Sequence, residues 1–202
     1  VLLILVAMQV IGVYFTDRLE ARLESNFKES VREKISLLAF NVEEEMSKER
    51  GENDNSLEED IRSLLYDFSS SDISEIQIIN DRSKIIGTSD RENQGIVGKR
   101  ATDLLIKRTL VVGLDDENVY LDENTNERIW VLATPIKKND KVIGAIYLVA
   151  TIENVYEQLR EIINIFATGT IIALGVTAVL GVLLAQTITR PMSDMRRQAL
   201  AM

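Results

Sequence analysis

The sequence predicts an α+β chain in which a polar domain, built on a five-stranded antiparallel sheet and a long N-terminal helix, is flanked by two transmembrane helices. Three observations lead to this prediction. The 202 residues divide into two apolar ends and an acidic middle, with a net charge of −9. An apolar residue recurs every three or four positions from Leu19 to Met46, which is the spacing of one helix face. Short apolar runs separated by turn residues follow, as is typical of strands.

Residues 1–16 carry no charge and are predicted to form the first transmembrane helix. A membrane-spanning helix needs roughly 20 apolar residues. This run is shorter and begins with Val1, so we expect a transmembrane helix that lacks its cytoplasmic start. The alternative, a signal peptide, would end in a small-residue cleavage site. Residues 14–18 contain none.

Residues 162–187 are predicted to form the second transmembrane helix, because the sequence has no charge from there to Thr189. Arg190, Arg196 and Arg197 follow, and positive charge favours the cytoplasmic side. We therefore expect a two-pass protein of the cell membrane, with both termini cytoplasmic and residues 17–161 extracellular. Small residues recur every four positions in this helix and predict a packing face, although they also fit the ordinary composition of such helices. They are Gly169, Ala173, Thr177, Gly181 and Ala185.

The outer domain opens with the helix that continues from the first span and is expected to end near Gly51. Ser56 and Glu59 form a capping box that begins a second helix. Strands are predicted at 76–78, 84–87, 119–121, 128–135 and 142–150, with a short helix at 101–110. Both alternating faces of the last two strands are apolar, so the sheet should be covered on both sides: by the long helix on one, and by the segment between the second and third strands on the other.

This order of elements resembles the extracytoplasmic PAS-like, or single Cache, sensor domain. The resemblance implies a ligand pocket between the sheet and the segment that crosses over it. Residues on the strands that could line this pocket are Tyr120, Arg128, Trp130, Thr134 and Tyr147. The alternative is that Trp130 and Tyr147 belong to the core and that Arg128 faces solvent.

The composition excludes several functions. The chain has no Cys and no His, so thiolate and imidazole catalysis and most zinc sites are ruled out. An acidic domain without a basic stripe argues against nucleic-acid binding. Residues 122–127 resemble the start of a calcium loop, but Glu127 stands where glycine is required. We therefore expect no metal site and no catalytic residue in this chain.

Residues 188–202 are predicted to begin a HAMP domain, a helical bundle formed between two subunits. Met192, Met195, Ala199 and Met202 follow the spacing of a coiled-coil seam. Pro191 lacks the backbone N–H of a helix and marks a hinge before the seam. The alternative is a short amphipathic tail at the membrane surface.

Four segments in order resemble the WalK (YycG) family of sensor histidine kinases of low-GC Gram-positive bacteria. They are MQVIGVYFT at residues 8–16, RIWV and KVIGAIY in the strands at 128–131 and 141–147, NVYEQL at 154–159, and TITRPMSDMR at 187–196. The resemblance covers the whole chain. It implies a sensing and transmembrane signalling role in the control of cell-wall metabolism.

The resemblance further implies a homodimer in the lipid bilayer, a response regulator as phosphoryl acceptor, and accessory membrane regulators of the YycH and YycI type. ATP and Mg²⁺ would serve a kinase domain that is absent here, so none of the family's catalytic residues can be carried over. Two other functions remain open from the residues alone. One is the sensor of a chemoreceptor or of a cyclic-dinucleotide enzyme, and the other is a membrane-anchored scaffold that binds cell-wall partners.

Overall fold

The computed structural model describes residues 2–49, 56–68, 70, 72–123 and 125–199. The chain divides into two compact units. One unit is the domain Leu19–Glu157, and the other comprises the two apolar ends. Each unit is described in turn.

Two helices begin the domain. Helix α1 spans Leu2–Ser47 and enters the domain at Leu19, and α2 spans Ser56–Phe68. The apolar stripe predicted on α1 is the face that packs into the core, because Val31, Ile35 and Leu38 are buried there. Burying one such side chain contributes about 1.5–3 kcal/mol, so this stripe fixes the helix against the sheet.

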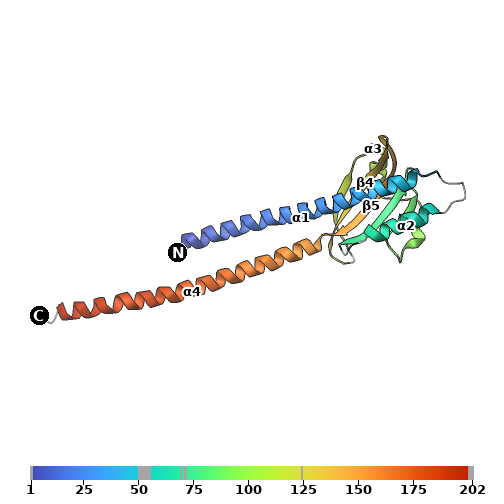
Figure 1. Ribbon diagram of the computed structural model, residues 1–202. Helices are drawn as coiled ribbons and strands as arrows, with labels where there is room; N and C mark the ends of the chain where they lie inside the picture. Colours follow the sequence, from blue (N-terminus) through green and yellow to red (C-terminus); the bar gives the residue numbers. More distant parts are fainter. Residues whose placement is uncertain (1, 50–55, 69, 71, 124, 200–202) are drawn as a thin grey trace. The chain divides into compact units, whose positions relative to one another are not determined.

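The sheet has the five antiparallel strands that the sequence predicts, in the order β2-β1-β5-β4-β3. Strands β1 and β2 form one hairpin, and β3, β4 and β5 form a meander whose last strand lies beside β1 (Figure 1). The strands are β1 Ile73–Asn80, β2 Ile85–Thr88, β3 Asp116–Leu121, β4 Arg128–Lys138 and β5 Lys141–Thr151.

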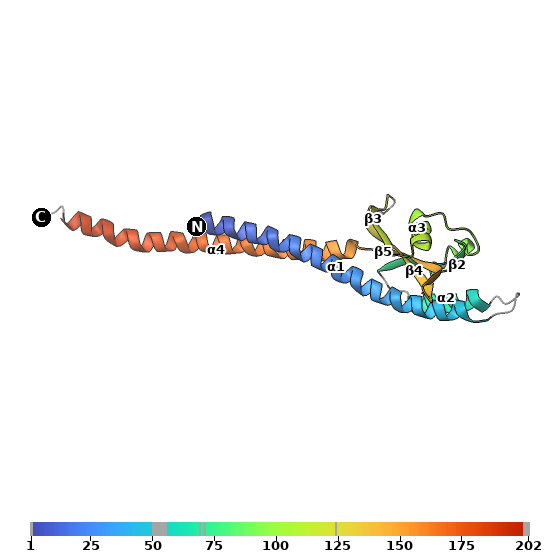
Figure 2. The ribbon, with the colours of Figure 1, turned by 90° about the horizontal axis from the view of Figure 1, so that it is seen from above.

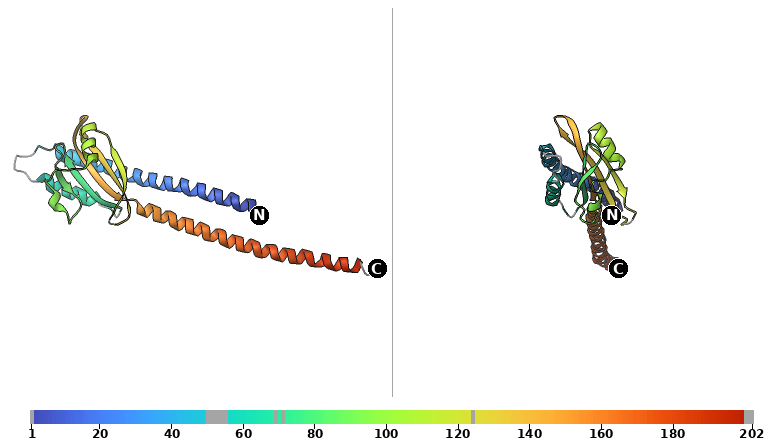
Figure 3. Two further views of the ribbon diagram at one scale, coloured as in Figure 1. Left: turned by 180° about the vertical axis from the view of Figure 1, so that it is seen from behind. Right: turned by 90° about the vertical axis from the view of Figure 1, so that its right-hand side faces the viewer.

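Helices cover both faces of this sheet, as predicted. Figures 2 and 3 show α1 and α2 on one face and α3, Leu104–Val112, on the other. Alternate residues of one strand therefore enter different cores. In β4, Trp130 and Leu132 pack with α1 and α2, whereas Val131 packs with Leu105 of α3. This alternation explains why both faces of the central strands are apolar.

The turns agree with the local sequence. Asn139 and Asp140 join β4 to β5 with φ of 49° and 63°, the left-handed values that a two-residue hairpin requires. Strand β4 runs on to Lys138, beyond the predicted end at Pro135. Strand β4 can contain Pro135 because its pairing with β3 ends at Ala133. The N–H that proline lacks would therefore have no strand partner on that side.

The helix on the second face begins three residues later than the predicted 101. Asp103 caps it, since its carboxylate accepts a hydrogen bond from the backbone N–H of Leu105 at 2.8 Å. Gly113 ends the helix in the left-handed conformation with φ of 70°. A capping residue has an extended backbone and stands just before the first helical residue. Because Asp103 takes this place, Ala101 lies outside the helix.

The second unit contains the first part of α1 and most of α4, Glu153–Ala199. Within the described residues, the segment Val155–Thr187 is long and apolar enough to cross a membrane. It contains the second span expected from the sequence. Gln9, Gly12 and Phe166 line a hollow of about 310 Å³ within this unit.

Candidate signal-coupling site

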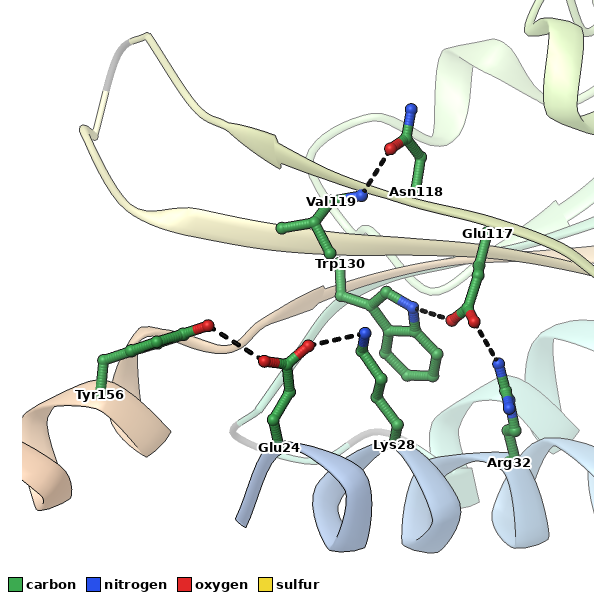
Figure 4. A network of polar contacts seen from close by, with 8 residues as sticks. All are labelled: Glu24, Lys28, Arg32, Glu117, Asn118, Val119, Trp130 and Tyr156. Atoms are coloured by element: carbon green, nitrogen blue, oxygen red, sulfur yellow. Dashed lines mark hydrogen bonds and ion pairs between the residues drawn. The ribbon is translucent and has the colours of Figure 1, made fainter. Parts of the chain in front are cut away.

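One face of α1 presents three charged side chains at four-residue spacing. Glu24, Lys28 and Arg32 stand one turn apart and point toward the sheet and the first turn of α4 (Figure 4). Residues four apart on a helix lie on the same side, so this row is a direct result of the sequence. The row forms two clusters, and Lys28 connects them because its ammonium lies 5.6 Å from the centre of the Trp130 ring.

The first cluster joins α1 to α4. Glu24 accepts a hydrogen bond from the hydroxyl of Tyr156 at 3.0 Å and forms an ion pair with Lys28 at 2.7 Å. The hydrogen bond from Lys28 is the largest effect on Glu24 and holds the pKa of this carboxyl below its usual value, although partial burial opposes it. Glu24 is therefore charged at neutral pH and is a strong acceptor for Tyr156.

Arg128 connects the same position to the sheet. Its guanidinium lies 4.1 Å from the centre of the Tyr156 ring, which is a cation–π contact. Its backbone carbonyl accepts a hydrogen bond from the N–H of Ile152 at 3.0 Å, at the junction between β5 and α4. The beginning of β4 therefore holds the beginning of α4 by both side chain and backbone.

The second cluster joins α1 to the edge of the sheet. Glu117 of β3 accepts a hydrogen bond from the indole N–H of Trp130 at 2.6 Å and pairs with Arg32 at 2.8 Å. Trp130 is fully buried, so Glu117 supplies the partner that its N–H requires. The rings of Phe27 and Trp130 also meet edge to face, 6.4 Å apart.

These contacts form one polar network between α1, two strands and α4. Each of its carboxylates is held by a hydrogen-bond donor and a cation, so the groups fix the helices and strands in position. Because it connects the sheet to both helices, a shift of the sheet would alter the partners of α1 and of α4. We therefore regard it as the candidate functional site.

The five strand residues predicted to line a ligand pocket do not gather in one place. Arg128, Trp130 and Thr134 alternate with residues that face α3, and they belong to the α1 side. The hydroxyl of Thr134 is buried and has no partner within the described residues. Trp130 is a core residue, which is the alternative that the sequence left open.

The other two lie on the α3 side. Tyr147 is opposite Ala133 and donates a hydrogen bond from its hydroxyl to Asp103 at 3.0 Å. Burial, together with the charge of Asp103, raises the pKa of Tyr147, so this hydroxyl stays protonated. Tyr120 pairs with Ile129 on the outer strand and is partly exposed.

The predicted packing stripe lies on the exposed surface of α4. A side chain added at Gly169 or Gly181 would meet nothing within 4 Å, and Thr177 bonds to the carbonyl of Ala173. The backbone remains helical through Pro191, Met192, Met195 and Ala199, so α4 continues across the expected hinge. Met202 lies outside the described residues.

Sequence reasoning missed the polar network. It identified the apolar stripe of α1 but not the row Glu24, Lys28 and Arg32 beside it, although the four-residue spacing was visible. Glu117 gave no signal, because its contact with Trp130 depends on the register between the neighbouring strands β3 and β4.

The fold defines the class: it is a Cache-like domain. A solved structure with this fold is the ligand-binding domain of the Campylobacter jejuni chemoreceptor Tlp3 in complex with L-norvaline. Its TM-score is 0.54 at 13% identity, covering 75% of this chain and 62% of that one. Residues 60–150 match the family described as the WalK sensor protein kinase Cache domain.

Two curated relatives extend the similarity beyond the domain. Sensor histidine kinase WalK of Bacillus subtilis (strain 168) is 38% identical over 203 residues, which is 99% of this chain. Sensor protein kinase WalK of Staphylococcus aureus (strain JH9) is 36% identical over 205 residues. The chain spans 33% of the length of each relative.

Proposed function

We propose that this chain detects an extracellular condition and transmits it through the membrane to a histidine kinase that controls cell-wall metabolism. A kinase of this type uses ATP and Mg²⁺ and passes the phosphoryl group to a response regulator. The relatives named above, with similarity along the whole chain, support this proposal. A chemoreceptor, a cyclic-dinucleotide enzyme and a passive scaffold are not favoured by these relatives.

The proposed topology has two spans, residues 1–16 and 162–187, with both ends in the cytoplasm. Support for the second span comes from the apolar segment Val155–Thr187. Support for the first comes from its sequence alone. We further propose a homodimer that packs through the small residues of α4 and continues into a HAMP bundle at residues 188–202. Accessory membrane proteins of the YycH and YycI type would contact the spans.

One observation carries the mechanism: the first turn of α4 is hydrogen-bonded to α1 through Tyr156 and Glu24, and α4 then continues as one helix to Ala199. In the proposed mechanism, the domain has two packings of α1 against α4, and a stimulus favours one by its differential affinity. Arg128 and Trp130 act here as coupling residues rather than as ligand contacts.

The test uses a full-length kinase that contains this chain, reconstituted in lipid vesicles. Tyr156→Phe removes this hydrogen bond, and Glu24→Gln replaces its charged acceptor with a weaker, neutral one. A bond worth about 1 kcal/mol changes a two-state equilibrium about fivefold. We expect both variants to shift autophosphorylation in the same direction by about this factor, and the double variant to shift it no further.

The matched control is Glu33→Gln, which removes the same charge from an exposed position of the same helix. It should leave autophosphorylation within twofold of the wild type, following the small effects of surface substitutions. If Tyr156→Phe and Glu24→Gln behave like this control while the protein stays folded, the coupling proposal is wrong.

A further inference from the structure

A hollow of about 270 Å³ lies at the β2 edge of the sheet, away from both polar clusters. Three parts of the chain form it: α2, the end of β2, and the loop that follows β2. The lining residues are Arg62, Tyr66, Thr88, Ser89, Arg91 and Gln94. No acidic side chain is among them, although the chain as a whole has a net charge of −9.

The two arginines give the hollow a positive charge. Neither Arg62 nor Arg91 forms an ion pair with a carboxylate in the described part of the chain. The guanidinium of Arg91 lies 4.3 Å from the centre of the Tyr66 ring, so the aromatic face holds it in place. A guanidinium held this way still has N–H donors at its edge for a carboxylate or phosphate.

The wall of the hollow is fixed before any ligand arrives. Gln94 donates hydrogen bonds from its amide to the carbonyls of Thr88 and Asp90, which ties the loop to the end of β2. The hydroxyl of Thr88 donates to Glu75 and accepts from the N–H of Asp90. On the other side, α2 packs so closely on β2 that a side chain at Gly87 would collide with Ile61.

Ser89 adds a neutral donor. Its hydroxyl oxygen accepts a hydrogen bond from the backbone N–H of Ile76 at 2.8 Å. The hydroxyl hydrogen has no acceptor within the described residues and can be given to a ligand. Two guanidinium groups, a hydroxyl and an aromatic ring thus surround a space of small-molecule size.

From this geometry we infer that the hollow is a binding site for a small oxyanion ligand, one that carries a carboxylate or a phosphate. Arg62 and Arg91 bind the oxyanion and Ser89 donates to it, while Tyr66 offers a surface for the rest of the ligand. Glu75 and Asp90 lie nearby, but both are engaged in hydrogen bonds with Thr88, Gln77 or the loop backbone. The site does not depend on the kinase assignment.

The test is calorimetry on the full chain in lipid nanodiscs, titrated with inorganic phosphate and separately with malonate. We expect saturable binding of at least one of these anions. Binding of phosphate alone identifies a phosphorylated ligand, and binding of malonate alone identifies a carboxylated one. Arg62→Gln and Arg91→Gln should each weaken binding about tenfold or more, because a charge-assisted hydrogen bond is lost.

The control is Arg82→Gln, which removes one positive charge from an exposed turn outside the hollow. It should change the affinity less than twofold, as expected for a surface charge. Both test arginines are exposed, so folding should be unaffected, and circular dichroism checks this. Absence of saturable binding for both anions, or equal weakening by all three variants, would overturn the inference. The experiment measures anion binding and not kinase activity, so this inference can fail while the proposed function holds, and the reverse.

Discussion

Gly144 shows how closely neighbouring strands constrain a single residue. It lies in β5 between Asn80 of β1 and Ile136 of β4. A Cβ atom at this position would lie 2.5 Å from the backbone carbonyl oxygen of Ile79. Backbone in a paired strand cannot move aside without breaking its ladder, so the space is reserved for glycine.

We therefore predict that Gly144→Ala lowers the free energy of unfolding by about 1–3 kcal/mol, the usual cost of overpacking. Chemical denaturation followed by circular dichroism measures this change. Gly95→Ala is the matched control, because a Cβ there meets nothing within 4 Å, and it should change stability by less than about 0.5 kcal/mol. Equal effects of the two substitutions would contradict the argument.

At the scale of elements, α3 depends on the residue that precedes it. Asp103 caps the helix and also accepts the hydrogen bond of Tyr147 from β5. The two roles use different oxygens of one carboxylate: Oδ1 for the cap and Oδ2 for Tyr147. One side chain therefore sets both where α3 begins and how it sits on the sheet.

Asp103→Ala should cost about 1 kcal/mol for the cap and about 1 kcal/mol for the lost bond to Tyr147. Tyr147→Phe should cost only the second amount. In a double-mutant cycle, the two substitutions should show a coupling energy of about 1 kcal/mol. Additive effects would mean that the hydrogen bond contributes nothing to the docking of α3.

The elements themselves could be predicted from sequence because their signals are local. Helical spacing predicted α1 and α2, and alternating apolar runs with turn residues predicted the five strands. The grouping of the site residues could not be predicted, because it depends on strand register. Alternation within β4 separates Trp130 from Val131, but only the pairing of Ala133 with Tyr147 shows which face Tyr147 occupies. The two-residue turn sets the register where β4 and β5 begin to pair, but a bulge between Ile136 and Lys137 shifts it by one residue, and no sequence signal indicated that bulge.

For the whole molecule, the charge of Glu24 links folding to pH. Its pKa is lowered in the folded state, so the carboxylate stabilises the fold at pH above the ordinary value of 4.5. As the pH falls below 4.5 and through the lowered pKa, the carboxylate takes up a proton. The ion pair with Lys28 and its stabilisation are then lost.

We predict that the melting temperature of the wild type exceeds that of Glu24→Gln at neutral pH, and that the difference shrinks as the pH falls below 4.5. Thermal melts from pH 7 to pH 3 measure it. Glu33→Gln should follow the wild type at every pH. A difference that stays constant down to pH 3 would show that packing, and not charge, explains the effect of Glu24→Gln.

The two edges of the sheet differ in a way that limits how these domains can associate. The loop after β2 covers that edge, since Ile85 exchanges backbone hydrogen bonds with Lys99 and Gly98. The β3 edge pairs only with β4 within the described residues. A second domain can thus add its strands at one edge alone. Two copies joined there would leave no open edge, so growth through strand pairing stops at a pair and cannot propagate into a fibre.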